Sequence, residues 1–421
     1  MHRHSYLILL VVLAAASLLA QEHKANRILS IDVNEGQGVD YPTAFSLAQD
    51  IGIGEVKQSL DWNYLDTANG YDFSIIDLIN YFYPLMGSPV SLIFRPINTN
   101  QPTLPPDLSG KPLDDDEVIQ RFKILLDSVK AHLDSTEVRA IHVGNEISAY
   151  LGTDDAKWNR FTTFYDSARL HIKRIWGNSM RVGSVGMWGA MTTPGTAGRY
   201  QSINHNSDII AVTYYPLNID FTVREPVVVA NDFQSLLSLY PDKPIHFVEA
   251  GYPSSALCNS SQEKQKQFII EMFNAWDTHK DRVELIDFTW MHDQDSAIVE
   301  QWVVAYGMSG LPNADKFAAY LGSLGMRTRG GSDKTAFTQL KLEAAARGWG
   351  TTEATFKSGG LSSTRRFRPV KHLLMESGNG PPRGTRASRN EMYSVDGRSI
   401  PAPAMQALPT QQLFVLPASL R

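Results

Sequence analysis

The stretch EVRAIHVGNE at residues 137–146 contains the two features from which the fold can be predicted, a short apolar run and a polar ending. Residues 137–143 have the length and composition of a buried strand. A pattern of helical period follows over residues 156–176. A strand followed by a helix is one unit of a parallel α/β fold, so this stretch predicts such a unit.

The same alternation recurs along most of the chain. The predicted strands cover residues 27–33, 55–60, 90–95, 137–143, 181–187, 208–215, 244–249 and 283–290, and the clearest helical patterns cover 114–133, 156–176, 261–280 and 334–347. Eight such units predict a (β/α)8 TIM barrel over residues 26–350. An open doubly wound sheet is the alternative, although residues 34–39 lack the glycine-rich phosphate loop expected after its first strand.

Composition restricts the class of protein. With 43% hydrophobic and 20% charged residues the chain can bury a large core, which excludes a wholly disordered protein. The net charge of -5 gives no overall basic field, so nucleic acid is not an expected partner. Cys258 is the only cysteine, which excludes an intramolecular disulfide and a cysteine-based metal site.

Both ends of the chain differ from the predicted barrel. Residues 1–20 resemble a secretory signal peptide, with Arg3 before an apolar run of about 15 residues that is too short to span a bilayer. We therefore expect a secreted protein, extracellular or periplasmic, without a membrane span after cleavage; an uncleaved anchor is the alternative. Residues 351–421 hold 10 Lys and Arg against 4 Asp and Glu, and they predict a basic, low-complexity, disordered tail.

Two predicted strands end in glutamate, and these residues are the candidate catalytic pair. Glu146 closes the fourth strand and Glu249 closes the seventh, so both carboxylates are expected at the C-terminal mouth of the barrel. Glycoside hydrolysis requires one carboxyl group as proton donor and a second as nucleophile or base. Glu35, which ends the first strand, is a rival candidate, and a pair of salt-bridged rim carboxylates is the structural alternative.

Three local motifs lie at the ends of predicted strands: Val143-Gly-Asn-Glu-Ile147, Thr213-Tyr-Tyr-Pro216 and Glu249-Ala-Gly-Tyr-Pro253. They resemble motifs of clan A glycoside hydrolases, and within the clan those of family 53, the endo-β-1,4-galactanases. The resemblance implies a retaining, cofactor-free enzyme in which Glu146 is the acid/base, Glu249 is the nucleophile and Asn145 binds the sugar 2-hydroxyl group. It also implies β-1,4-galactan as substrate, although residues 57–62 and 95–98 have no counterpart in the family's early strands.

Aromatic residues at strand ends are the candidate sugar contacts. Flat rings can stack on sugar faces, and core packing is the alternative for each of them. Since successive strand residues alternate between the two faces, only one of Tyr214 and Tyr215 can face the mouth, and we predict that Tyr214 does so and bonds Glu249. Arg95 is expected to act electrostatically or in a structural ion pair. The candidate substrate-binding residues are Asn145, Tyr214, Tyr215, Trp290, Trp188, Trp62 and Arg95.

Two other classes of function stay open at this point. A metal-dependent barrel hydrolase would use His142, His246 or His292, but no His-Glu-X-X-His motif occurs, and strand alternation predicts that His246 points toward the helices. We therefore predict no metal. A noncatalytic carbohydrate-binding barrel would keep the cleft without turnover. In either carbohydrate-related case the expected partner is a polysaccharide or oligosaccharide, and a monomer is the default.

Overall fold

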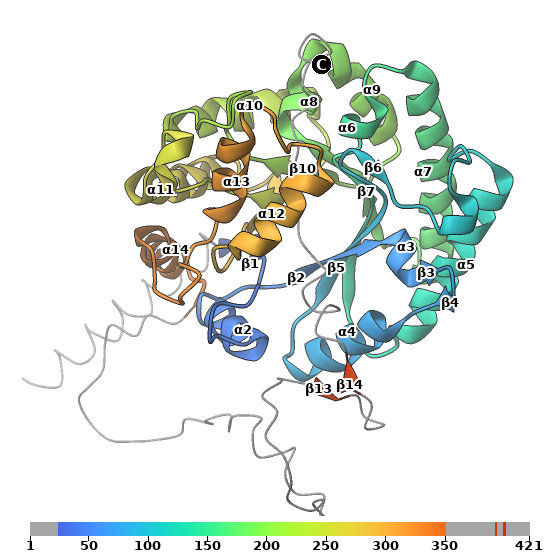
Figure 1. The fold of residues 1–421 in the computed structure, drawn as a ribbon, viewed down its shortest axis with the longest axis horizontal. Coiled ribbons are helices and arrows are strands. Elements are labelled where there is room, and N and C mark those ends of the chain that lie inside the picture. Colours follow the sequence, from blue (N-terminus) through green and yellow to red (C-terminus); the bar gives the residue numbers. More distant parts are fainter. Residues whose placement is uncertain (1–23, 351–391, 394–398, 401–421) are drawn as a thin grey trace, which may run out of the picture. The chain divides into compact units, whose positions relative to one another are not determined.

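The computed structural model describes residues 24–350, 392–393 and 399–400 (Figure 1). The chain divides into two compact units, of which the first contains residues 24–350. Within the second unit, β13 (Met392–Tyr393) and β14 (Ser399–Ile400) form an antiparallel pair. The predicted signal peptide and the rest of the predicted disordered tail lie outside the described residues, so both stay predictions.

Eight parallel strands, one of them divided into two segments, form the centre of the first unit, at the predicted places. The structure divides the predicted strand 181–187 into two halves around Ser184. The barrel strands are β1 (Ile28–Ile31), β2 (Val56–Asp61), β5 (Val90–Asn98), β7 (Val138–Asn145), β8 (Arg181–Gly183) with β9 (Val185–Met187), β10 (Ile210–Tyr214), β11 (Ile245–Ala250) and β12 (Val283–Phe288).

The strands close into a barrel. One arc runs β1-β12-β11-β10-β9 and the other runs β2-β5-β7-β8, so the divided strand belongs to both arcs. At the opposite seam, Gly54 N donates to Leu29 O (2.8 Å) and Ser30 Oγ donates to Glu55 O (2.9 Å), which joins β1 to the start of β2. The predicted (β/α)8 barrel is therefore confirmed, and the open doubly wound sheet is excluded.

A ring of helices surrounds the strands (Figure 1). Aspartate caps explain where several helices begin: Asp115 accepts from Glu117 N and Val118 N, and Asp154 accepts from Ala156 N and Lys157 N. The main helices are α2 (Tyr41–Asp50), α4 (Ser74–Leu85), α5 (Asp116–His132), α7 (Asp155–Trp176), α9 (Pro194–Asn204), α10 (Val229–Leu239), α11 (Gln262–Thr278) and α14 (Thr335–Ala346).

Short elements extend the loops that follow the strands. They are α3 (Trp62–Leu65), β3 (Asp66–Thr67), β4 (Gly70–Tyr71), β6 (Gln101–Pro102), η1 (Pro106–Leu108), α6 (Ser148–Leu151), α8 (Trp188–Thr192), η2 (Pro226–Val228), η3 (Ala256–Cys258), α12 (Ser296–Ala305) and α13 (Ala314–Gly322). The last two form an insertion after β12, and Figure 1 shows them inside the ring of main helices rather than as part of it. Such loops build the substrate face of a barrel.

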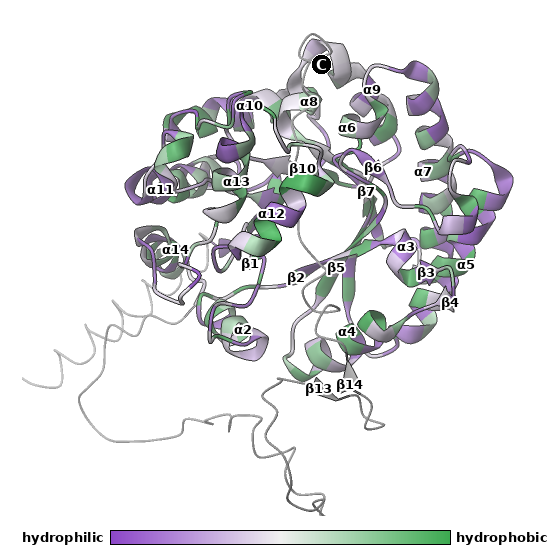
Figure 2. Ribbon diagram, viewed as in Figure 1, coloured by the Kyte–Doolittle hydropathy of each residue, from purple (hydrophilic) through white to green (hydrophobic). Residues whose placement is uncertain are grey.

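The main core lies between the strands and the helices, where Leu29, Leu92 and Phe247 are fully or almost fully buried. Figure 2 shows the corresponding mixture of hydrophobic and hydrophilic residues along α7 and α11. Near the end of the described unit, the rings of Trp276 and Trp349 stack with centroids 4.9 Å apart, and the guanidinium of Arg27 lies 5.0 and 5.1 Å from these two centroids. No helix within the described residues is long and apolar enough to cross a membrane.

Candidate active site

Glu146 and Glu249 lie at the C-terminal ends of β7 and β11, and both are fully buried. Each carboxylate has different neighbours. Glu146 accepts hydrogen bonds from Thr213 Oγ1 (2.8 Å) and Thr99 Oγ1 (3.1 Å), whereas Glu249 accepts one from the Tyr215 hydroxyl (3.1 Å) and lies 3.6 Å from Lys57 Nζ. Two carboxyl groups in unlike surroundings can hold unlike protonation states.

The backbone around Glu146 is unusual. Glu146 itself has φ of 49° and follows Gly144 at φ of 83°. A Cβ at Gly144 would lie 2.7 Å from Ile147 Cγ2 and 2.9 Å from Phe161 Cζ, so glycine is required there. A glutamate held in the left-handed region costs on the order of 1–3 kcal/mol, and such residues concentrate at functional sites. The strained turn directs the Glu146 side chain to the hydroxyls of Thr99 and Thr213.

A β-bulge determines the direction of the Glu249 side chain. Val212 pairs with Phe247 and Thr213 pairs with Glu249, so Val248 is the extra residue on β11. The bulge resets the alternation along the strand. His246 therefore also lies inside the barrel, with Nε2 3.3 Å from Glu284 Oε2 and its ring 6.4 Å from the His142 ring. The prediction that His246 points toward the helices is wrong.

Burial raises the pKa of Glu249 to about 7, and the charge of Asp32 acts in the same direction. Lys57, the Tyr215 hydroxyl and Arg95 oppose this rise because they favour the charged carboxylate. The pKa of Glu249 therefore depends both on burial and on these polar contacts, so a change in any of the contacts changes the pH at which Glu249 ionises.

Tyr215, and not Tyr214, bonds Glu249. Strand alternation places Ala211, Thr213 and Tyr215 inside the barrel and Tyr214 outside it. The Tyr214 hydroxyl donates to Asp232 Oδ2 (2.8 Å) and its ring packs against Phe233 and Phe247. The predicted role of Tyr214 at the mouth is therefore corrected, because that side chain belongs to the layer between strands and helices.

This pair of tyrosines allows a matched test. We expect Tyr215→Phe to lower kcat/KM about tenfold near neutral pH, because removing a bond to the charged form of Glu249 raises its pKa by about one unit. Tyr214→Phe should leave kcat/KM near the wild-type value and lower the free energy of unfolding by about 1 kcal/mol. Steady-state kinetics and chemical denaturation measure both effects. Loss of activity in Tyr214→Phe alone would contradict the placement.

Arg95 and Asn145 both lie at the mouth. Arg95 Nε pairs with Asp61 Oδ1 (2.7 Å), as the structural alternative predicted, and its charge also lowers the pKa of Glu249. Asn145 directly precedes Glu146, and its backbone carbonyl accepts from Thr99 N (2.9 Å). The proposed contact of Asn145 with a sugar hydroxyl group stays a prediction.

The three tryptophans predicted to contact sugar, Trp62, Trp188 and Trp290, have different surroundings. Trp62 lies in the core, with its ring centroid 4.9 Å from Phe122 and 6.2 Å from Phe164, so its predicted role as a sugar platform is wrong. Trp188 donates from Nε1 to Asp232 O (2.9 Å), and the Arg224 guanidinium lies 5.4 Å from its ring centroid. Trp188 is therefore held by the packing of α8 against α10.

Trp290 is the tryptophan that meets the insertion after β12. It is buried, and its ring lies 5.6 Å from that of Trp302 on α12. Its predicted role as a platform at the mouth stays a prediction.

The insertion also contributes two tyrosines that were not predicted. Tyr306 follows α12 and is hydrogen-bonded to Thr99, which in turn bonds Glu146. Tyr320 lies on α13 with its ring 5.6 Å from that of Tyr215, and the charges of both Glu146 and Glu249 raise its pKa further above the effect of burial. The insertion thus places two phenols beside the candidate pair.

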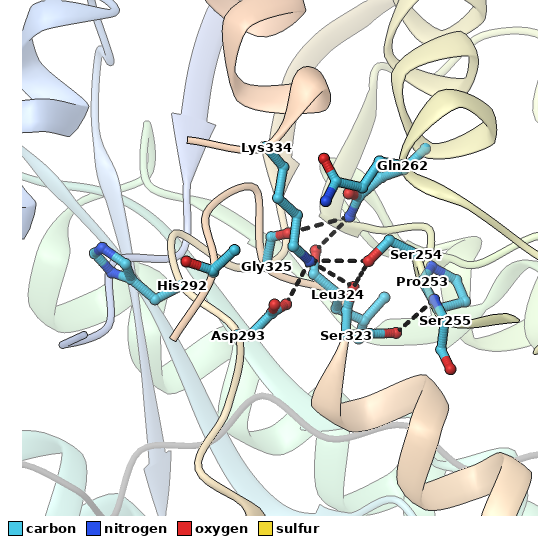
Figure 3. Close-up of polar contacts among 12 residues, drawn as sticks. Pro253, Ser254, Ser255, Gln262, His292, Asp293, Ser323, Leu324, Gly325 and Lys334 are labelled. Atoms are coloured by element: carbon cyan, nitrogen blue, oxygen red, sulfur yellow. Dashed lines mark hydrogen bonds and ion pairs between the residues drawn. The ribbon is translucent and has the colours of Figure 1, made fainter. Parts of the chain in front are cut away.

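One buried lysine fixes the two ends of this insertion (Figure 3). Lys334 Nζ donates to Asp293 Oδ1 (2.6 Å) at its start and to Ser323 O (3.1 Å) at its end. It also donates to Ser254 Oγ (3.0 Å) after β11. A Cβ at Gly325 would lie 2.1 Å from Asp293 N, which shows how closely the two ends approach. The position of α12 and α13 at the mouth is therefore anchored to the barrel.

The rival carboxylate and the metal alternative receive no support from the geometry. Glu35 Oε1 accepts from Tyr41 N (3.1 Å) at the start of α2, so this carboxylate has a backbone partner at the start of a helix. Within residues 24–350, no three His, Cys, Asp or Glu side chains are arranged to hold a metal ion. His292 is engaged by Asn34, whose backbone oxygen lies 2.8 Å from Nδ1.

Comparison with solved structures gives several matches to the barrel. A GH53 catalytic domain from Ignisphaera aggregans aligns with a TM-score of 0.55 at 14% identity, over 76% of this chain and 96% of that one. The fold is shared with glycoside hydrolases. A GH5_18 protein from Bifidobacterium longum subsp. infantis aligns with a TM-score of 0.57 at 15% identity, over 76% of this chain and 79% of that one.

A further match is a GH5_18 protein from Streptomyces cattleya in complex with Manβ1-4GlcNAc, with a TM-score of 0.58 at 14% identity, over 78% of this chain and 82% of that one. No protein-family model and no curated protein matches the sequence. At these identities the likeness establishes the (β/α)8 barrel fold that these glycoside hydrolases share.

Proposed function

We propose that this protein is a retaining glycoside hydrolase that cleaves β-glycosidic bonds, with Glu249 as nucleophile and Glu146 as acid/base. One observation carries the proposal: two carboxylates end strands β7 and β11 of a glycoside hydrolase barrel, in unlike surroundings. Lys57 and Tyr215 favour the charged form of Glu249, as a nucleophile requires. Glu146 accepts hydrogen bonds from the hydroxyl groups of Thr99 and Thr213.

The reaction would proceed in two steps. In the first, a Glu249 oxygen attacks the anomeric carbon while Glu146 gives its proton to the departing glycosidic oxygen, so a glycosyl ester forms and the leaving alcohol is released. In the second, Glu146 takes a proton from water, the resulting hydroxide attacks the same carbon, and the ester bond to Glu249 breaks. Two inversions leave the anomeric configuration unchanged, and both carboxyl groups return to their starting forms.

The comparisons and the local motifs support a choice of substrates to test first. The Streptomyces cattleya protein was solved with Manβ1-4GlcNAc, and the motifs around Glu146 and Glu249 resemble those of endo-β-1,4-galactanases. We therefore place β-1,4-linked galactan and β-linked manno-oligosaccharides first among the substrates to test. Tyr306 and Tyr320 are the phenols that the insertion adds beside the pair, and we propose that they contact the sugar. The signal-like residues 1–20 support export to the substrate.

The test of this proposal is release of reducing ends from galactan, xylan, mannan, β-glucan and Manβ1-4GlcNAc by the full-length protein. We expect release from one of these, and proton NMR of the first product should show the β-anomer before mutarotation. An α-anomer as first product would overturn the retaining mechanism. Binding of one glycan, measured by calorimetry, without release from any would favour the noncatalytic carbohydrate-binding barrel.

A further inference from the structure

Lys57 is a buried cation inside the barrel, at a level below the two glutamates. It belongs to β2, where its neighbour Gln58 points outward and donates from Nε2 to the Tyr83 hydroxyl on α4 (2.7 Å). Alternation along the strand therefore directs Lys57 inward. Its side chain is 5% exposed. A buried ammonium group is costly unless carboxylates or carbonyls pair with it, so the partners of Lys57 define its role.

Three acceptors surround the Lys57 amino group. Nζ lies 3.0 Å from Asp32 Oδ2 after β1, 2.8 Å from Val248 O and 3.6 Å from Glu249 Oε1. Val248 is the extra residue of the bulge that orients Glu249. One ammonium group thus holds both the backbone next to Glu249 and the carboxylate itself.

We propose that Lys57 is a positioning residue for the reaction, which fixes the bulge at Val248 and keeps the Glu249 carboxylate charged for attack, with Asp32 as its counterion. This inference rests on the proposed function, because it assigns to Lys57 a part in the nucleophile's chemistry. The lysine acts through Glu249 and does not itself contact the sugar.

The charges near Glu249 support this role. Burial lowers the pKa of Lys57, but the charges of Asp32, Glu249 and Asp287 outweigh burial and raise it above its ordinary value, so the amine stays protonated. Burial raises the pKa of Asp287 well above its ordinary value, and the charge of Lys57 opposes this rise. Lys57 Nζ lies 3.0 Å from Asp32 Oδ2 and 3.6 Å from Glu249 Oε1, so its charge is shared between these two carboxylates. Other titratable groups around Glu249 and these partners include Glu55, Arg95, His142, Glu146, Tyr215 and Tyr320.

The ionisation of Glu249 determines how kcat/KM is expected to depend on pH. The attacking form of Glu249 is the carboxylate, so kcat/KM falls as the pH drops through the Glu249 pKa. Lys57→Met removes a charge that lowers this pKa, so the acid limb of the profile should move to higher pH by about one unit, a tenfold loss at a fixed pH on that limb. Asp32→Asn removes a charge that raises the pKa, so the acid limb should move to lower pH.

Opposite shifts from two neighbouring substitutions distinguish an electrostatic role from a structural one. Damage to the fold would lower kcat/KM at every pH in both variants and leave the limb in place. Lys57→Arg keeps the charge and should keep the limb near its wild-type position. Lys264→Met, which removes an exposed lysine paired with Glu225 on the surface (2.7 Å), is the matched control and should shift nothing.

A second measurement does not depend on turnover. The full-length protein labelled with 13C at glutamate carboxyl carbons allows Glu249 to be titrated by NMR, with Glu249→Gln identifying its signal. If the wild type hydrolyses a glycan but neither Lys57→Met nor Asp32→Asn moves the limb or the titration, the inference is overturned and the proposed function stands. If the wild type hydrolyses nothing, the proposed function fails, and the titrations still decide whether Lys57 controls the charge of Glu249. Should Lys57→Met not fold, the direction of the Asp32→Asn shift decides.

Discussion

Glu249→Gln is expected to lower kcat/KM about 10³-fold or more while the protein stays folded. The amide has nearly the same shape as the carboxylate and can still accept a hydrogen bond from Tyr215, but it carries no charge and cannot attack the anomeric carbon. Initial rates of reducing-end release, on the glycan that the wild type cleaves, measure the loss. Circular dichroism and thermal unfolding check that the barrel is intact.

Glu35→Gln is the matched control for this experiment, because Glu35 is the rival candidate for a catalytic carboxylate at a strand end. In the structure it accepts a backbone hydrogen bond from Tyr41 at the start of α2, so the control should hydrolyse at close to the wild-type rate. If Glu249→Gln kept more than about a tenth of the activity, or if Glu35→Gln lost most of it, the assignment of the nucleophile would be wrong.

Glu146→Ala should produce a loss that depends on the leaving group. On a polysaccharide, whose leaving alcohol must be protonated, we expect kcat/KM to fall about 10²- to 10⁴-fold. On an aryl glycoside with an acidic phenol the first step needs no proton, so formation of the glycosyl ester should be almost unaffected. Sodium azide should then speed turnover, because azide attacks the ester without general-base help, and the product should be a β-glycosyl azide.

Thr213→Val provides the comparison for the acid/base role. It removes one hydroxyl group that donates to Glu146 and leaves the carboxyl group in place, so its loss should be smaller and should not respond to azide. Equal losses on the polysaccharide and the aryl glycoside for Glu146→Ala, with no glycosyl azide formed, would show that Glu146 is not the proton donor.

The two carboxylates at strand ends were predictable because a glutamate directly after an apolar run is easily recognised in a sequence. Glu146 and Glu249 lie where the rhythm of strands and helices predicted them. The orientation of individual side chains was harder to predict. Alternation shows that Tyr214 and Tyr215 face opposite sides but not which one faces inward, and the extra residue Val248 resets alternation on β11, which made the expectation for His246 wrong.

Other parts of the site depend on contacts between segments far apart in sequence. Thr213 could have been found as the residue two positions from Tyr215 on the same face of β10. Tyr306 and Tyr320 could not, because they come from a long loop whose path depends on Lys334 and Gly325. In the sequence, Lys57 differs from the family pattern but carries no sign of its role. Its contact with Glu249 requires the closed barrel, which brings β2 and β11 together around a common interior.

Because Lys334 holds both ends of the insertion after β12, this insertion is a suitable segment to exchange by protein engineering. Asp293 and Ser323 converge on one ammonium group, so the segment between them begins and ends at nearly the same point of the barrel (Figure 3). A segment with adjoining ends can be exchanged for another of different length without displacing the strands that hold Glu146 and Glu249. Under the proposed function, transplanting another segment between Asp293 and Ser323 would replace Tyr306 and Tyr320 beside the pair, and so change the contacts to the glycan.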